Sequence, residues 1–266
     1  MKELRNKSAA VLSRQFNSAT RLVEYLEDNN IPFFAKDNIY NALVSLGKQV
    51  GMTPEEYRQE LVDEATIAFE YVLHTLAIDV ENDPNSRETP HRLAKMYINE
   101  MLEGRYVAAP KVTAFPNEKV GDGKYVESKQ MSGDMYHFNN LLVVQSPFTS
   151  VCSHHHAPVT GTAYIGIIPG EKVIGLSKYT RLVQYMATRG TLQEELTTAI
   201  ADIISEKSQS EDIAVVVYGR HGCCENRGVR VPNSQTATAE MRGLFMLDGK
   251  LREEFYDHVK MMRREK

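Results

Sequence analysis

The sequence predicts an α+β protein, in which a helical N-terminal region precedes an antiparallel sheet packed with helices. The spacing of the apolar residues is the first observation, because it changes from about every four positions in the N-terminal region to every two from Leu142 on. The order of the later elements is the second, because it reads strand, strand, helix, helix, strand, strand. We therefore expect an N-terminal helical region over residues 1–104 and a second domain over 105–266.

The N-terminal region contains three helix signals. Residues 5–28 are amphipathic, with Leu22, Val23 and Leu26 at helical spacing. Thr53-Pro54-Glu55-Glu56 combines an N-cap, a first-turn proline and a capping-box glutamate, and apolar residues then recur every four positions at Tyr57, Leu61, Ala65, Phe69 and Leu73. Thr89-Pro90 begins a further helix that runs to Gly104, with Leu93, Met96 and Tyr97 on one side and Arg92, Lys95 and Asn99 on another.

The second domain begins with an irregular stretch. Five Pro and Gly residues among polar ones predict loops and short edge strands over residues 105–140. The strands that follow are expected at 142–151, 160–168, 213–218 and 236–245. Between the second and third strands we expect one helix from Ser177 to before Gly190, and another that begins at Thr191 and carries Leu192, Leu196, Ile200 and Ile203 on one face.

The composition narrows the class of protein. Of 266 residues, 42% are hydrophobic and 25% charged, which is typical of a globular chain, and 31 Lys and Arg against 35 Asp and Glu leave a net charge of −4. We expect no nucleic-acid partner, because there is no general basic surface. No apolar run approaches the roughly 20 residues of a membrane span, and no signal-peptide core is present, so we expect a cytoplasmic protein without a membrane partner.

The three cysteines lie in two clusters that could hold a metal. Cys152-Ser153-His154-His155-His156 follows a predicted strand, and its C-x-x-H spacing lets a thiolate and an imidazole face one ion. His221-Gly222-Cys223-Cys224 follows the third long strand. If strand geometry persists there, His221 and Cys223 share a face and Cys224 points away. This alternation favours Cys223 as the ligand.

Two thiolates and one imidazole favour an open zinc site that activates water, since structural zinc sites usually have four protein ligands. A closed site that uses a spare histidine as fourth ligand is the alternative. Spare histidines near an open zinc ion would also suit general acid/base chemistry, because their pKa lies near neutral pH.

Further polar groups lie on the two helices between the strands. Ser177 and Lys178 start the first helix, where backbone N–H groups favour anions. Five cations form a possible cage for a polyphosphate: Lys178, Arg181, Arg227, Arg92 and Lys95. Thr191-Leu192-Gln193-Glu194 allows two interpretations, because Glu194 would either cap the helix or accept two hydrogen bonds from a guanine.

Several segments together resemble GTP cyclohydrolase I in order and spacing, over about residues 53–258. They are ETPHRLAKMY at 88–97, CSHH at 152–155, VIGLSK at 173–178 with Arg181, LQE at 192–194, and HGC at 221–223 with Arg227-Gly228. The resemblance implies a zinc ion held by Cys152, His155 and Cys223, with His154 and His221 as acid/base groups. It also implies that Gln193 and Glu194 hold guanine, that the five cations surround the triphosphate, and that Ser177 helps to seat the substrate.

The resemblance implies the reaction as well: opening of the imidazole ring of GTP, loss of C8 as formate, and closure to 7,8-dihydroneopterin triphosphate. His221 would protonate a departing nitrogen, and His154 would move protons in the later ribose steps. The implied architecture is the tunnelling fold (T-fold), in which the sheets of several subunits join into a barrel, commonly in a homodecamer with active sites between subunits. The product would feed folate, other pterins or deazapurines.

Some residues depart from the family pattern. Ser153 stands where a glutamate is usual, Cys224 is an extra thiol, and the segments before Thr53 and over 105–140 are longer than is typical. Two alternatives therefore stay open. One is a divergent member that releases a formamidopyrimidine intermediate or uses another purine nucleotide, and the other is a non-catalytic structural zinc protein.

Overall fold

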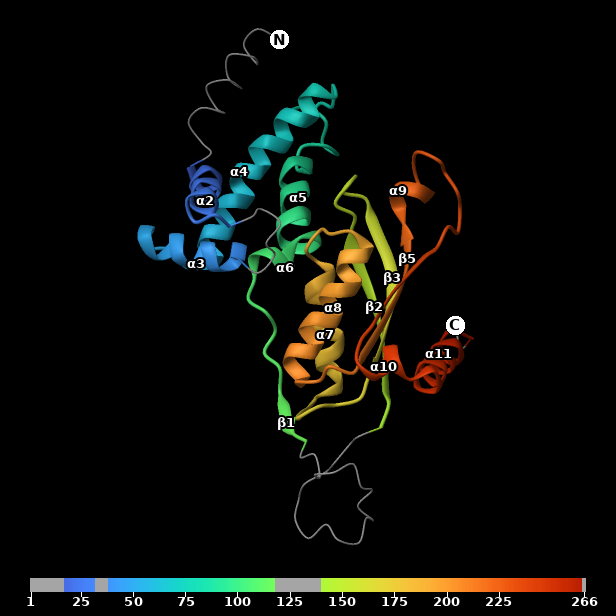
Figure 1. Ribbon diagram of the computed structural model, residues 1–266. Coiled ribbons are helices and arrows are strands. Elements are labelled where there is room, and N and C mark those ends of the chain that lie inside the picture. The colour runs from blue at the N-terminus through green and yellow to red at the C-terminus, as the bar shows by residue number, and fades with distance from the viewer. Residues whose placement is uncertain (1–16, 32–37, 118–139, 265–266) are drawn as a thin grey trace. The chain divides into compact units, whose positions relative to one another are not determined.

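A computed structural model describes residues 17–31, 38–117 and 140–264 of the chain (Figure 1). The chain divides into two compact units, residues 1–108 and 109–266. Residues 5–16 of the expected first helix and residues 118–139 of the expected irregular stretch lie outside the described residues.

The described part of the first unit is helical throughout. Its elements are α2 (Asn17–Asp28), α3 (Asn38–Val50), α4 (Pro54–Thr75), α5 (Thr89–Lys95), a π-helix (Met96–Met101) and α6 (Glu103–Tyr106). The long helix α4 begins where the sequence predicts. The Thr53 hydroxyl accepts from the backbone N–H of Glu56, and the Glu56 carboxylate accepts from that of Thr53. The capping box is thereby confirmed.

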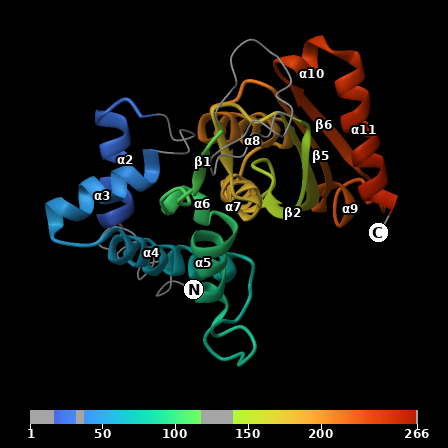
Figure 2. The ribbon, with the colours of Figure 1, turned by 90° about the horizontal axis from the view of Figure 1, so that it is seen from below.

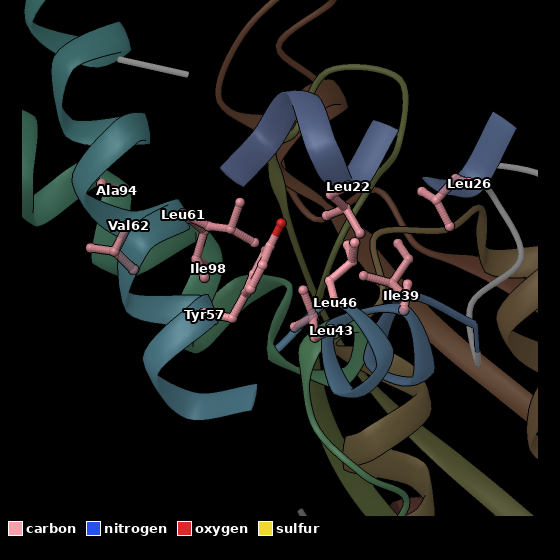
Figure 3. Close-up of a cluster of buried hydrophobic side chains, with 11 residues drawn as sticks. Leu22, Leu26, Ile39, Leu43, Leu46, Tyr57, Leu61, Val62, Ala94 and Ile98 are labelled. Atoms are coloured by element: carbon pink, nitrogen blue, oxygen red, sulfur yellow. The ribbon is translucent and has the colours of Figure 1, made fainter. Parts of the chain in front are cut away.

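The apolar stripe of α4 is part of the core of this unit (Figure 3). Tyr57, Leu61 and Val62 of α4 pack with residues of α2, α3 and α5, namely Leu22, Leu26, Ile39, Ala42, Leu43, Leu46, Ala94 and, from the π-helix, Ile98. Tyr57 also donates a hydrogen bond to the Ser18 carbonyl, 2.8 Å away. The buried Glu64 carboxylate accepts from the backbone N–H groups of Ser18 and Ala19 at 2.7 and 2.8 Å, and so caps the start of α2.

Two details of this unit differ from the expectation. Val23 is exposed, because it lies outside the face that Leu22 and Leu26 bury. The expected helix over 89–104 is not one regular α-helix, because a π-helical segment over Met96–Met101 interrupts it. The buried residues of α5 and of this segment are Pro90, Ala94 and Ile98.

The second unit is built on a four-stranded antiparallel sheet in the order β2-β3-β5-β6. The strands are β2 (Leu142–Val151), β3 (Pro158–Ile167), β5 (Ile213–His221) and β6 (Thr236–Met241). A separate two-stranded sheet pairs β1 (Ala114–Pro116) with β4 (Lys172–Ile174). The four strands expected from the sequence are therefore confirmed, although β5 runs on to His221 instead of ending at Tyr218 and β6 ends earlier than expected.

Helices cover both faces of the sheet (Figure 2). On one side lie α7 (Leu176–Ala187) and α8 (Gln193–Ser208), which contact β2 and β5 respectively. On the other lie α10 (Leu244–Leu247) and α11 (Gly249–Arg264), whose Phe245, Phe255 and Val259 pack on Tyr164 and Val216. Gly166 of β3 allows this packing, because a Cβ there would lie 2.6 Å from the Phe255 ring. No helix among the described residues is long and apolar enough to cross a membrane.

The C-terminal end differs most from the expectation. The strand expected over 236–245 ends at Met241, and Phe245 belongs to α10. The chain turns at Gly243, which has a φ of 54°, and the Asp212 carboxylate then accepts from the Leu244 N–H at 2.8 Å. Helix α11 was not expected at all. The α+β class is confirmed. The expected barrel would form from the sheets of several subunits, so it stays a prediction.

Candidate metal and catalytic site

The pairing of β3 brings the two metal-binding clusters to the same end of the sheet. Pro158 of β3 pairs with Val151, the residue before Cys152. Val159, the next residue of β3, pairs on its other side with His221. Because one strand pairs with both β2 and β5, segments that are about 70 residues apart in sequence end side by side.

A tight loop follows β2 and holds Cys152. The Cys152 N–H donates to the Ala157 carbonyl at 3.0 Å, and the His156 N–H donates to the Cys152 carbonyl at 2.9 Å. Cys152 is buried, whereas Ser153, His154, His155 and His156 are exposed. His156 takes a left-handed conformation with a φ of 50°, which closes the loop.

A short helix, α9 (Gly222–Glu225), follows β5 and carries the other two thiols. The premise that strand geometry persists past His221 is therefore wrong, because the chain turns into a helix at Gly222. The Cys224 sulfur lies 3.9 Å from the Cys223 sulfur, but Cys224 is not part of the group that Cys223 forms with Cys152 and His221. The choice of Cys223 survives for a different reason, which is that the helical turn brings its sulfur back to the end of the sheet.

Three side chains are gathered there. Ligand atoms of Cys152, His221 and Cys223 all lie within 4.8 Å of one another. Two sulfurs and one imidazole nitrogen are the donor set of catalytic zinc sites with three protein ligands. His155, the imidazole that the resemblance implies as a ligand, is exposed and not part of this group.

Burial and neighbouring thiols raise the pKa of Cys223 above its usual value. Burial is the largest cause, and the thiols of Cys224 and Cys152 add to it. In the metal-free protein this thiol is therefore held in its protonated form. A metal that binds it as a thiolate has to displace the proton, which couples metal binding to proton release.

Gln193 connects α8 to His221. Its side chain is buried, and its Oε1 lies 2.8 Å from Nε2 of His221. Its Nε2 donates to the carbonyls of Val217 and Thr236 at 3.2 Å and to the Thr238 hydroxyl at 3.1 Å. The whole side-chain amide is thus engaged within the chain.

The capping interpretation of Glu194 is wrong. The N-cap of α8 is Leu192, one residue after the expected Thr191, and it is the Glu195 carboxylate that accepts from the Leu192 N–H, at 3.1 Å. Thr191, the expected cap, is buried, and its hydroxyl has no partner among the described residues. Glu194 is exposed in the first turn of α8, next to Gln193. Its carboxylate is therefore not needed to cap the helix.

The cations of α7 lie away from the gathered thiols within one chain. The Ser150 hydroxyl, close to Cys152, donates to the Ala187 carbonyl at the C-terminal end of α7. Ser177 is in the first turn of the same helix, about 15 Å away along its axis at 1.5 Å per residue. Lys178 and Arg181 lie in the first two turns, and Arg181 is exposed.

The remaining cations are exposed. Arg227 follows α9 in the sequence, and Arg92 and Lys95 belong to α5 in the other unit. The structure thus brings together Cys152, His221, Cys223 and Gln193, whereas within the second unit Ser177, Lys178 and Arg181 lie toward the other end of α7. The contact between Gln193 and His221 and the space that Gly219 leaves for it were missed by sequence reasoning, and the one available signal was a glycine within an otherwise β-branched strand.

Comparison with known proteins gives one consistent result. The sequence profile of GTP cyclohydrolase I matches residues 65–260. GTP cyclohydrolase 1 of Aliivibrio salmonicida (strain LFI1238) is 31% identical over 228 residues, covering 84% of this chain and 95% of that protein. The protein of the same name from Aeromonas hydrophila subsp. hydrophila is 35% identical over 190 residues, covering 71% and 79%. That from Campylobacter jejuni subsp. doylei is 34% identical over 195 residues, covering 72% and 94%.

Proposed function

Because this chain belongs to the GTP cyclohydrolase I family, we propose that it is an enzyme that hydrolyses GTP to 7,8-dihydroneopterin triphosphate and releases formate. The observation that carries the assignment in the chain itself is the gathering of Cys152, His221 and Cys223 at one end of the sheet. These three side chains come from two segments that are distant in the sequence, and their ligand atoms lie within 4.8 Å of one another. They fit a reaction centre.

The donor set fits zinc. Cys152 and Cys223 supply two sulfurs, and the third protein ligand is His155, by resemblance, or His221, by its place in the group. A zinc ion bound there would supply a strong nucleophile from water at neutral pH and stabilise negative charge. Zinc content of His155→Ala and His221→Ala variants separates the two ligand sets, because only the loss of a ligand should weaken zinc binding strongly.

The histidines would move protons. His221 is at the end of β5, beside the thiols, and in this proposal it protonates the nitrogen that leaves when the imidazole ring of GTP opens. His154 is exposed in the loop after Cys152, and it would transfer protons during the later ribose steps. If a His221→Ala variant kept full ring-opening activity, the proposed role of His221 would be contradicted. If a His154→Ala variant accumulated the ring-opened formamide, the proposed role of His154 in the ribose steps would be supported.

The exposed polar groups would bind the substrate. Glu194 would accept hydrogen bonds from N1–H and the 2-amino group of guanine, which adenine does not offer. The triphosphate would be held by Lys178, Arg181, Arg227, Arg92 and Lys95, and Ser177 would help to seat it. These cations are exposed or half-buried, so they are accessible to a polyanion.

We propose that the active site forms between subunits. Along α7, Ser177 and the cations next to it lie toward the end of the helix away from Cys152, so one chain alone separates the phosphate-binding groups from the thiols. A second copy would bring its own cations to this site, as in a T-fold homodecamer. Light scattering together with activity tests this, because a fully active monomer would contradict it.

The decisive experiment is incubation with GTP, with and without a metal chelator, while formate and the pterin absorbance are measured. Formate, the pterin and a loss of both with chelator are expected. A formamidopyrimidine product, or a preference for another purine nucleotide, would instead indicate the divergent member that Ser153 suggests. Four protein ligands and no activity would indicate a structural zinc protein. We further propose a cytoplasmic enzyme whose product supplies folate, other pterins or deazapurines.

A further inference from the structure

The side-chain amide of Gln193 can be oriented without ambiguity. Its nitrogen faces the carbonyl oxygens of Val217 and Thr236, which only accept hydrogen bonds. In the flipped orientation the amide oxygen would face these two oxygens, and three acceptors would meet without a hydrogen. The nitrogen therefore points at the strands, and Oε1 points at His221.

This orientation determines which nitrogen of the His221 ring donates the hydrogen bond to Gln193. A carbonyl oxygen accepts but never donates, so Nε2 of His221 has to carry a hydrogen for the 2.8 Å contact with Oε1 to be a hydrogen bond. In the neutral ring the other nitrogen, Nδ1, is then the one without a proton. Nδ1 is thus the nitrogen available to a metal ion or to a proton of the substrate.

The sheet leaves space for this contact. At Gly219 in β5, a Cβ atom would collide with Oε1 of Gln193 and would lie 3.2 Å from its Cδ. Any other residue at this position would push the amide oxygen away from His221. Gly219 is therefore needed not for its backbone conformation but for the room that Oε1 occupies.

We propose that Gln193 is a positioning residue that fixes the ring of His221, with Gly219 as the residue that makes room for it. The inference deepens the proposed function, on which it rests. It differs from the guanine contact that resemblance implies for Gln193, because this buried amide already directs its nitrogen at the strands and its oxygen at His221. Guanine recognition then falls to Glu194 and not to its buried neighbour.

Steady-state kinetics of Gln193→Ala test the proposal. Because the side chain acts through the catalytic ring and not on the substrate, kcat should fall about 10- to 100-fold while KM for GTP stays within about threefold. Gln184→Ala is the matched control, since it removes a glutamine amide bonded to the Pro147 carbonyl on the exposed side of α7, and it should leave kcat within about twofold. A tenfold rise in KM with kcat retained would mean that Gln193 binds guanine after all.

Gly219→Ala provides an independent variant, because it keeps every polar atom and serves even if Gln193→Ala does not fold. It should lower kcat in the same way. In the Gln193→Ala background, however, the added methyl meets no amide oxygen, and it should change kcat less than about twofold. If the fold-changes in kcat of the two single variants simply multiply in the double variant, the proposal is overturned.

Crystal structures of the wild type and of Gln193→Ala give a readout that needs no activity. We expect the His221 ring to turn or to occupy more than one orientation once its acceptor is gone. An unchanged ring would overturn the positioning role. An inactive wild type in which the ring still bonds to Oε1 would instead count against the proposed function alone.

Discussion

Two adjacent glutamates at the start of α8 should separate helix capping from base recognition. We compare Glu194→Ala with Glu195→Ala, which remove the same charge from neighbouring exposed positions of one helix. The carboxylate of Glu195 accepts from the Leu192 N–H at 3.1 Å, whereas Glu194 is not part of the cap. Each substitution also changes helix propensity by the same amount, so the difference between them isolates the cap.

The magnitudes follow from these contacts. Loss of one exposed capping bond should cost Glu195→Ala about 0.5–1 kcal/mol, or about 1–4 °C in Tm for a unit of this size. Glu194→Ala should leave Tm unchanged. It should instead lose two charge-assisted hydrogen bonds to guanine, each worth about 1.5–3 kcal/mol, so kcat/KM for GTP should fall at least about 100-fold.

Thermal melting and steady-state kinetics of the two variants are sufficient. Inosine 5′-triphosphate, which lacks the 2-amino group, adds a specificity readout, because the wild-type preference for GTP should shrink in Glu194→Ala and persist in Glu195→Ala. The reverse pattern, with Glu194→Ala less stable but fully active, would refute the assignment of the two carboxylates.

Three other substitutions test separate features. Glu64→Gln should lower the free energy of unfolding in urea by about 1–3 kcal/mol, because the two N–H groups at the start of α2 bond to different carboxylate oxygens and the amide nitrogen that replaces one of them cannot accept. The exposed Glu60→Gln control should stay within about 0.5 kcal/mol of the wild type, and equal stabilities of the two variants would contradict the capping role. Burial raises the pKa of Tyr179 to about 12, so the wild type should lose stability as pH rises from about 10 to 12, by about 1.4 kcal/mol at pH 11. Tyr179→Phe should lack that loss and be no less stable at pH 7, since the hydroxyl has no partner among the described residues; a parallel decline in both proteins would argue against it. Cys223→Ser should abolish zinc binding measured by chelator competition and Cys224→Ser should not, whereas equal losses would make Cys224 a ligand.

The elements that the sequence predicts well are those whose signal is local. The capping box at Thr53 and Glu56 needs only four adjacent residues, and the alternation that predicts β3 needs only its own ten. The thiol site was predictable in part, because a thiol and imidazoles cluster at the ends of predicted strands. The structure places Cys223 in the group that could hold a metal ion, although the strand geometry assumed for it is wrong.

The features that were missed depend on packing between distant segments. Gln193 and His221 are 28 positions apart, and only the packing of α8 on β5 brings them together. The capping box expected at Thr191 and Glu194 does not form, since Thr191 is buried and the Leu192 N–H donates to the Glu195 carboxylate instead. In the same way, the turn after β6 depends on a distant residue, because the Leu244 N–H donates to the carboxylate of Asp212, which is 32 positions earlier in the sequence.

The thiol site can form only when the central strand β3 pairs with β2 and β5 in the correct register. Val151 and His221 are matched to consecutive residues of this one strand, so a slip by a single residue on either side would turn side chains to the opposite face and separate the two clusters. Only the correctly aligned sheet presents the full donor set. Metal would therefore bind that alignment in preference to any shifted one and stabilise it by mass action. During refolding, added zinc should increase the yield of correctly paired sheet as well as restore a reaction centre.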